Sequence, residues 1–202
     1  MNERLQKGEH MKNRKEEILL ASLHLFAQNG YEAVSVSQIA GELGMTKGAL
    51  YRHYQNKRDI FHHIVKKMEQ GDSEQAEDYS MPQENGAADL QQKISEKQFI
   101  AYSKAMFEYW TEDDFASSFR KMLTLEQFRN EEMQRLYQQY LVAGPAEYVK
   151  ELFKNMGISD SQESANQFYG TMFFFYSMYD GAKDKEKIKK MFEQTIDQFA
   201  EK

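Results

Sequence analysis

The sequence predicts an all-α protein, in which an N-terminal three-helix unit is joined by a fourth helix to a larger C-terminal helical bundle. Apolar residues recur at helical spacing, and no run of β-branched residues alternates as in a half-buried strand. The 202 residues include only two prolines, Pro82 and Pro145, so few helices are interrupted. Cysteine is absent, which excludes disulfides, thiolate metal sites and cysteine nucleophiles. We expect about nine helices, no metal site and no cofactor.

The first element is a helix over residues 12–28, with Ile18, Ala21, Leu25 and Phe26 on its inner face. The polar residues 1–10 before it are expected to form a flexible tail, and Met11 is a possible alternative start. This segment has no apolar core, so it does not resemble a signal peptide. No stretch approaches the roughly 20 apolar residues of a membrane span, and the lack of cysteine fits a reducing cytoplasm.

The second and third elements are two short helices within residues 37–61, joined by a tight turn at Gly44. Ser37 suits the N-cap of the first helix, and Gly44 provides the left-handed residue that commonly ends a helix. Thr46 is placed to cap the second helix, which turns Ala49 and Leu50 inward. This arrangement is typical of a helix-turn-helix that reads DNA.

The outer face of the second short helix carries the groups that a DNA contact needs. Lys47 can reach guanine acceptors in the major groove, and Gly48 leaves room for the backbone to approach a base edge. Tyr51, His53 and Lys57 are placed to donate to phosphates, which fix register without reading sequence. The alternative is structural, because two amphipathic helices joined at a glycine occur in many all-α proteins.

Residues 18–61, ILLASLHLFAQNGYEAVSVSQIAGELGMTKGALYRHYQNKRDIF, resemble the DNA-binding domain of the TetR family of transcriptional regulators. Spacing and residue type agree with the family at many positions. The agreement is clearest in three segments: LFA and GY at the end of the first helix (residues 25–31), SVS, IA and G in the first short helix and its turn (residues 35–44), and KGALYRHY and NK in the second short helix and beyond (residues 47–57). The resemblance covers about a third of the chain. Tyr54 departs mildly from the Phe or small aliphatic residue that is usual in the family.

The resemblance implies a role for several individual residues. It places Lys47 and Gly48 at bases, and Arg52 at a position that varies within the family and so suits a specificity residue. It implies phosphate contacts for Ser35, Ser37, Thr46, Tyr51, His53 and Lys57. The implied partner is a double-stranded, near-palindromic DNA operator.

The charge distribution is compatible with DNA binding although the net charge is −6. Residues 1–70 contain 11 Lys/Arg against 8 Asp/Glu, and residues 71–202 contain 15 against 24. Attraction to phosphate acts within about 8 Å at physiological salt, so the local excess of Lys and Arg matters more than the net charge of the chain. Because the excess is small, two copies of the N-terminal unit should bind better than one.

The fourth helix is expected over residues 57–69, with Ile60, Phe61, Ile64, Val65 and Met68 on one face. Residues 71–97 then hold seven acids, two glycines and a proline, which is typical of a connector. We therefore expect a flexible tail at 1–10, a DNA-binding domain at 11–70, a polar connector at 71–97, and a ligand-binding and dimerisation domain at 98–202.

The C-terminal part is rich in aromatic residues and methionine, and five further helices are expected there. They span residues 99–110, 114–127, 131–156, 161–179 and 185–199, the third being bent at Gly144-Pro145. The helix over 161–179 is apolar nearly all round, so it needs cover on more than one side. A second subunit could supply that cover, and members of the TetR family generally dimerise through their last two helices. The expected interface residues are Phe168, Met172, Phe175, Tyr176, Ile188, Met191, Phe192, Thr195, Ile196 and Phe199.

The aromatic and methionine surplus has two interpretations, a generous core or a cavity for a small hydrophobic or amphipathic effector. The candidate pocket residues are Tyr102, Met106, Phe107, Trp110, Phe128, Tyr137, Tyr140 and Phe168. A lipophilic cation and an acyl chain both fit this description. The leading hypothesis is a homodimeric repressor released by such a ligand. The alternative is a DNA-binding adaptor whose C-terminal part binds a protein. An enzyme is not expected, because no catalytic or phosphate-binding motif is present.

Overall fold

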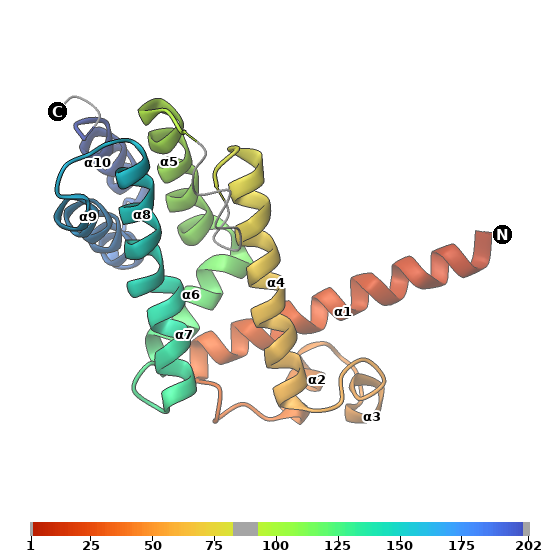
Figure 1. The fold of residues 1–202 in the computed structure, drawn as a ribbon. Helices are drawn as coiled ribbons and strands as arrows, with labels where there is room; N and C mark the ends of the chain where they lie inside the picture. Colours follow the sequence, from red (N-terminus) through yellow and green to blue (C-terminus); the bar gives the residue numbers. More distant parts are fainter. Residues whose placement is uncertain (1, 83–92, 200–202) are drawn as a thin grey trace.

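The structure is a computed structural model that describes residues 2–82 and 93–199. Across these two ranges the regular secondary structure consists of ten helices and no strand (Figure 1). The all-α prediction is confirmed. No helix within the described ranges has both the length and the apolar character needed to cross a membrane. The helices are α1 (Asn2–Asn29), α2 (Val36–Glu42), α3 (Lys47–Leu50), α4 (Lys57–Asp78), α5 (Glu96–Glu112), α6 (Asp114–Glu126), α7 (Glu131–Leu141), α8 (Ala143–Asn155), α9 (Ser161–Gly181) and α10 (Lys185–Asp197).

The N-terminal unit consists of α1, α2, α3 and the first half of α4, which we call the head. Its core is formed by fully buried aliphatic and aromatic side chains at helical spacing, such as Ile18, Phe26, Ile39 and Leu50. Helix α1 extends beyond the head at its N-terminal end (Figure 1). Residues 2–10 are therefore helical rather than the expected loose tail, because this stretch has no proline and is rich in Glu, Lys, Arg and Gln, which are good helix formers.

Helix α4 is longer than the sequence predicts. It was expected to end at residue 69 and instead continues to Asp78. The buried positions Met68 and Ala76 lie on the same face, eight residues apart, so the apolar stripe crosses the expected boundary at residue 70. The connector expected over 71–97 thus begins and ends in helix, since α5 starts at Glu96, while residues 83–92 lie outside the described residues.

The C-terminal unit, which we call the body, packs α5 to α10 around an aromatic core. The ring of Phe107 on α5 stacks on Phe192 of α10 with centroids 4.0 Å apart, and Phe168 of α9 contacts Phe99 and Phe153. Pairs of this kind are worth about 0.5–1.5 kcal/mol beyond their buried area. They tie α9 and α10 to α5 and α8 within one protomer.

The helix expected over residues 131–156 is interrupted, although the break is at Val142 rather than at Gly144-Pro145. Pro145 lies in the first turn of α8, where the missing N–H has no helical partner to lose. A Cβ on Gly144 would lie 2.0 Å from the carbonyl oxygen of Gln139, so the α7–α8 corner requires glycine there. This split accounts for the tenth helix.

The expected dimer stripe proves to be the inner face of α9 and α10. Its members Phe168, Met172, Phe175, Tyr176, Ile188, Phe192 and Ile196 are buried in the protomer. They are covered by the protomer's own helices, and this is the cover that the pattern of α9 required. Thr195 and Phe199 are half-buried, and Met191 is 37% exposed. Phe174 of α9 points away from this inner face and is 59% exposed.

Candidate DNA-binding and ligand-binding sites

Three caps fix the geometry of the helix-turn-helix. The N-cap of α2 is Ser35 rather than Ser37, because the Ser35 hydroxyl accepts from the Gln38 amide (3.2 Å) and the Gln38 side chain accepts from the Ser35 amide (2.7 Å). Such a reciprocal capping box satisfies two backbone donors at once. Ser37 lies instead in the first turn of α2 and is exposed.

The turn and the start of α3 follow the sequence prediction. Gly44 has a φ of +59°, and the Met45 amide donates to the Ala40 carbonyl at 2.9 Å, which closes α2 in the left-handed manner. The Thr46 hydroxyl accepts from the Ala49 amide at 3.2 Å and caps α3. Local hydrogen bonds therefore fix both the turn before α3 and the first turn of α3.

The outer face of α3 is open. Lys47, Gly48, Tyr51 and Arg52 are exposed, Tyr51 to 44%, and a Cβ on Gly48 would meet no atom within 4 Å. The protein itself therefore does not require a glycine at position 48. This surface has the size and polarity that the predicted base contacts need, and the contacts themselves stay predictions.

His53 and Tyr54 lie at the edge of this surface. His53 is half-buried, and partial desolvation, aided by Lys15 and Arg14, lowers the pKa of its imidazole, which favours the neutral ring. Tyr54 is buried, its hydroxyl donates to the Lys15 carbonyl at 3.2 Å, and burial raises its pKa to about 12. The hydroxyl by which Tyr54 departs from the family pattern thus ties α1 to the end of the reading unit.

Lys57 has partners within the protein. Its ammonium donates to the carbonyls of Tyr31 (2.8 Å) and Glu32 (3.3 Å) and lies 4.3 Å from the centre of the Tyr31 ring. These contacts hold the α1–α2 loop against the start of α4. The structure therefore gives Lys57 a structural role, beside which the phosphate contact remains a prediction.

The head rests on α6 of the body. The His24 imidazole on α1 lies 2.7 Å from an Asp114 carboxylate oxygen, and the Tyr31 amide donates to Glu126 at 3.2 Å. Glu126 is buried, and a Cβ on Gly30 would come within 2.6 Å of its carboxylate. The loop after α1 is therefore fitted closely to the end of α6.

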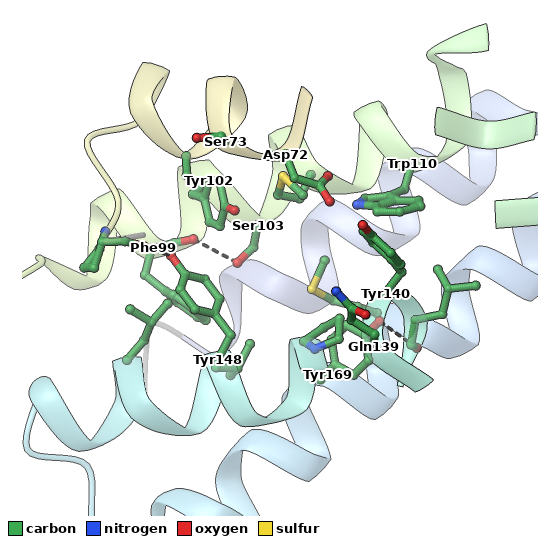
Figure 2. Close-up of a pocket in the computed structure, with 18 of the residues that line it drawn as sticks. Asp72, Ser73, Phe99, Tyr102, Ser103, Trp110, Gln139, Tyr140, Tyr148 and Tyr169 are labelled. Atoms are coloured by element: carbon green, nitrogen blue, oxygen red, sulfur yellow. Dashed lines mark hydrogen bonds between the residues drawn. The ribbon is translucent and has the colours of Figure 1, made fainter. Parts of the chain in front are cut away.

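The body contains a cavity of about 410 Å³ lined by α4, α5, α7, α8 and α9 (Figure 2). Four of the predicted pocket residues line it: Tyr102, Met106, Trp110 and Tyr140. Its volume lies within the range of about 300–1,000 Å³ that is usual for small-molecule sites. The cavity lies between the helices where the sequence predicts one, and ligand binding in it stays a prediction.

Four predicted pocket residues lie elsewhere. Phe107 packs between Tyr176 and Phe192 in the core, and Phe168 packs among the rings of Phe99, Phe153 and Phe199. Tyr137 is buried without lining the cavity, and Phe128 is 89% exposed beyond the end of α6. An aromatic ring at a helical position does not by itself indicate whether it faces a cavity or a neighbouring helix.

The sequence prediction missed the contribution of α4 to this cavity. Glu69, Asp72, Ser73 and Ala76 line it, together with Tyr148 and Tyr169 from α8 and α9. Asp72 and Ala76 follow Met68 at steps of four residues, so the helical period contained the signal. It was missed because the acidic composition of residues 71–97 indicated a connector.

In the parts of the chain that the structure covers, no group of three His, Asp or Glu side chains is arranged to hold a metal ion. The two sites are accordingly an exposed polar surface on α3 and an aromatic cavity in the body. Helix α4 is common to both units.

Comparisons with known proteins match these two units. Residues 18–64 match the family described as bacterial regulatory proteins, tetR family. YerO of Bacillus subtilis, an uncharacterised HTH-type transcriptional regulator, is 43% identical over 50 residues, which are 25% of this chain and 17% of that protein. The similarity to this curated relative is thus confined to a small part of its length.

Two solved structures share the fold of nearly the whole chain. A transcriptional regulator (TerR/AcrR family) from Aquifex aeolicus VF5 has a TM-score of 0.65 at 15% identity and covers 92% of this chain and 98% of that one. The fatty acid degradation regulator FadR from Bacillus halodurans has a TM-score of 0.60 at 18% identity, with 90% and 93% covered. Residues 18–64 therefore match the helix-turn-helix DNA-binding domain of the TetR family, and nearly the whole chain shares its fold with these two structures.

Proposed function

We propose that the protein is a transcriptional repressor that binds a palindromic operator as a homodimer in the cytoplasm. The family assignment of the head and the open face of α3 support this function. Each α3 would enter a major groove, with Lys47, Gly48 and Arg52 at bases. The residues proposed to lie at phosphates are Ser35, Ser37, Thr46, Tyr51, His53 and Lys57. A twofold dimer would place the two heads about 34–36 Å apart, one helical turn of DNA.

The observation that carries the regulatory part is the continuity of α4. Its first turns pack in the head through Ile60 and Ile64, and its last turns line the body cavity through Asp72 and Ala76. A ligand in the cavity therefore touches the same helix that positions the reading unit. We propose that a small hydrophobic or amphipathic effector binds there.

The effector would act by shifting a population rather than by pushing the head. It would favour a head spacing that no longer matches the operator, in proportion to its different affinities for the two states. A difference of about 1–3 kcal/mol gives roughly 5–150-fold relief of repression. The similar structure named as a fatty acid degradation regulator keeps an acyl compound among the candidates.

Selection of bound sequences from random double-stranded DNA tests the proposal. We expect a near-palindrome whose half-sites are one helical turn apart, and loss of enrichment when Lys47 and Arg52 are both replaced by alanine. Failure of the intact protein to enrich any sequence would contradict the proposed function. If operator binding holds but no small molecule raises the melting temperature of the body, the adaptor hypothesis, with a protein partner in place of an effector, would replace the ligand-responsive one.

A further inference from the structure

Among the described residues, the charged groups that line the body cavity are acidic. Glu69 and Asp72 line it from α4, and among the described residues no Lys, Arg or His does so. Asp72 is half-buried, and in Figure 2 it lies on the side of the cavity near Trp110 and Tyr140. The described part of the cavity wall therefore carries acidic side chains and no basic one.

Arg120 is the basic residue that packs behind this cavity, and its guanidinium is fully engaged. Its two terminal nitrogens donate to the Asp180 carboxylate at 2.6 and 2.7 Å, and its Nε donates to the Trp110 carbonyl at 2.9 Å. It lies 5.3 Å from the centre of the Tyr176 ring, which itself lines the cavity. An anionic ligand would have to break a bidentate ion pair to recruit it.

Three hydroxyl groups of the cavity wall donate to backbone carbonyls of the protein. Tyr148 donates to the Pro82 carbonyl (2.7 Å), Tyr169 to the Leu141 carbonyl (2.8 Å) and Ser103 to the Phe99 carbonyl (2.8 Å). A carboxylate or phosphate needs donors, and these hydroxyl protons are already used. The wall also presents the aromatic faces of Trp110 and Tyr176.

Aromatic rings beside a carboxylate form a favourable environment for an organic cation. The faces of Trp and Tyr attract a cation within about 6 Å of the ring centre, and the attraction grows when water is excluded. The charge of Asp72 also acts on neighbouring phenols, because it adds to burial in raising the pKa of Tyr109 and Tyr176. A positive charge in the cavity would be stabilised by the same field.

We propose that the cavity binds a lipophilic organic cation, such as a quaternary ammonium or phosphonium compound, and discriminates against fatty acids and other lipophilic anions. The proposal rests on the proposed function only in identifying this cavity as the effector site. It narrows the effector from any amphipathic molecule to one charge class. Asp72 supplies the principal charge, and Glu69, which is exposed, lies at the rim.

The test compares two probes of nearly equal shape and opposite charge, tetraphenylphosphonium and tetraphenylborate. Trp110 is the only tryptophan in the chain and lines the cavity, so its fluorescence reports binding directly. For the full-length protein we expect saturable quenching by the phosphonium ion and binding at least tenfold weaker for the borate. Equal or tighter binding of the borate, or of decanoate, would overturn the proposal.

An isosteric substitution assigns the charge to its residue. Asp72→Asn should weaken phosphonium binding by roughly 10- to 100-fold, as is usual for the loss of a charged partner. The substitution keeps the shape of the side chain, so the contacts with the aromatic rings should be unchanged. Glu74→Gln is the matched control, since Glu74 is exposed on the same helix and does not line the cavity, and should leave affinity unchanged. Equal affinities of wild type and Asp72→Asn would also overturn the proposal.

Operator binding is measured separately, with DNA alone. A protein that selects a palindrome but prefers the borate contradicts only the charge class. A protein that binds the phosphonium ion through Asp72 but selects no DNA contradicts only the proposed function. The two failures are therefore distinguishable.

Discussion

At the scale of single residues, the head separates positions that the fold needs from positions that it leaves open. Gly44 is required because its φ of +59° is costly for other residues. Gly48 has an open environment, so its lack of a side chain is not explained by packing. A residue that the fold does not need, on the face proposed to enter DNA, is the clearest mark of the predicted interface.

Gly48→Ala should stabilise the protein while weakening its binding to DNA. Alanine is favoured over glycine within a helix by about 0.5–1 kcal/mol, and the new methyl group meets no protein atom. Urea unfolding should show this gain, and operator affinity should fall at least tenfold if a base edge approaches the backbone here. Gly41→Ala in α2 is the matched control, since its Cβ would also be unobstructed, and should gain stability without losing affinity.

Lys47→Ala should lose operator affinity selectively. If the ammonium reads a guanine, the loss is about 1–3 kcal/mol on the operator and much less on random DNA. Titration of both DNAs at one salt concentration measures the difference. An equal loss on the two would assign Lys47 to a phosphate. The exposed position of its side chain, near the Tyr51 ring at 5.7 Å, makes a loss of stability unexpected.

At the scale of elements, α4 runs from the head to the cavity, and one of its glycines lies against a tyrosine side chain of α5. A Cβ on Gly71 would lie 2.2 Å from the Tyr109 hydroxyl oxygen and 3.3 Å from the ring carbon that bears it. Burial raises the pKa of this phenol well above its ordinary value, in keeping with a tightly enclosed group. The Tyr109 hydroxyl therefore occupies the space that a side chain at position 71 would need.

Gly71→Ala should destabilise the protein by roughly 1–3 kcal/mol, as overpacking usually does. Adding Tyr109→Phe removes the oxygen that collides and should restore most of the loss, so the double variant should unfold at a higher urea concentration than Gly71→Ala alone. Tyr109→Phe by itself serves as the reference in this double-mutant cycle. Additive effects of the two changes would show that the collision with the Tyr109 hydroxyl does not cause the loss of stability.

At the scale of the whole molecule, the proposed dimer uses the outer face of α9 and α10. Phe174 and Met191 are the large apolar side chains that remain exposed on these two helices in the protomer. A weakly basic head binds DNA better in pairs, so association at this face and DNA affinity should change together.

Phe174→Glu should convert a dimer into a folded monomer. The substitution places a charge on the proposed contact face while leaving the protomer core intact, so the circular dichroism spectrum should be unchanged and the mass in solution should halve. Sedimentation equilibrium measures that mass. Phe128→Glu is the control, because Phe128 is equally apolar and 89% exposed far from α10 in sequence, and should remain dimeric. A dimeric Phe174→Glu protein would exclude this face.

The sequence by itself determined the helical fold, the position of the helix-turn-helix and the caps at Gly44 and Thr46. These features depend on periodicity and on backbone preferences that act over a few residues. The sequence placed the N-cap of α2 at Ser37 instead of Ser35, because both serines offer a hydroxyl that could cap the helix. The structure selects Ser35, since the Gln38 side chain completes a capping box with that residue.

The tertiary structure alone decided which face of each aromatic helix is inside. Phe168 belongs to the protomer core and Phe174 lies outside, although both lie in the same aromatic-rich helix α9. It also brought Asp72 of α4 to a cavity walled by α5, α7, α8 and α9. Apolar burial is non-directional, so periodicity identifies a buried face without naming what covers it, and only the packing of distant helices defines a cavity and its charge.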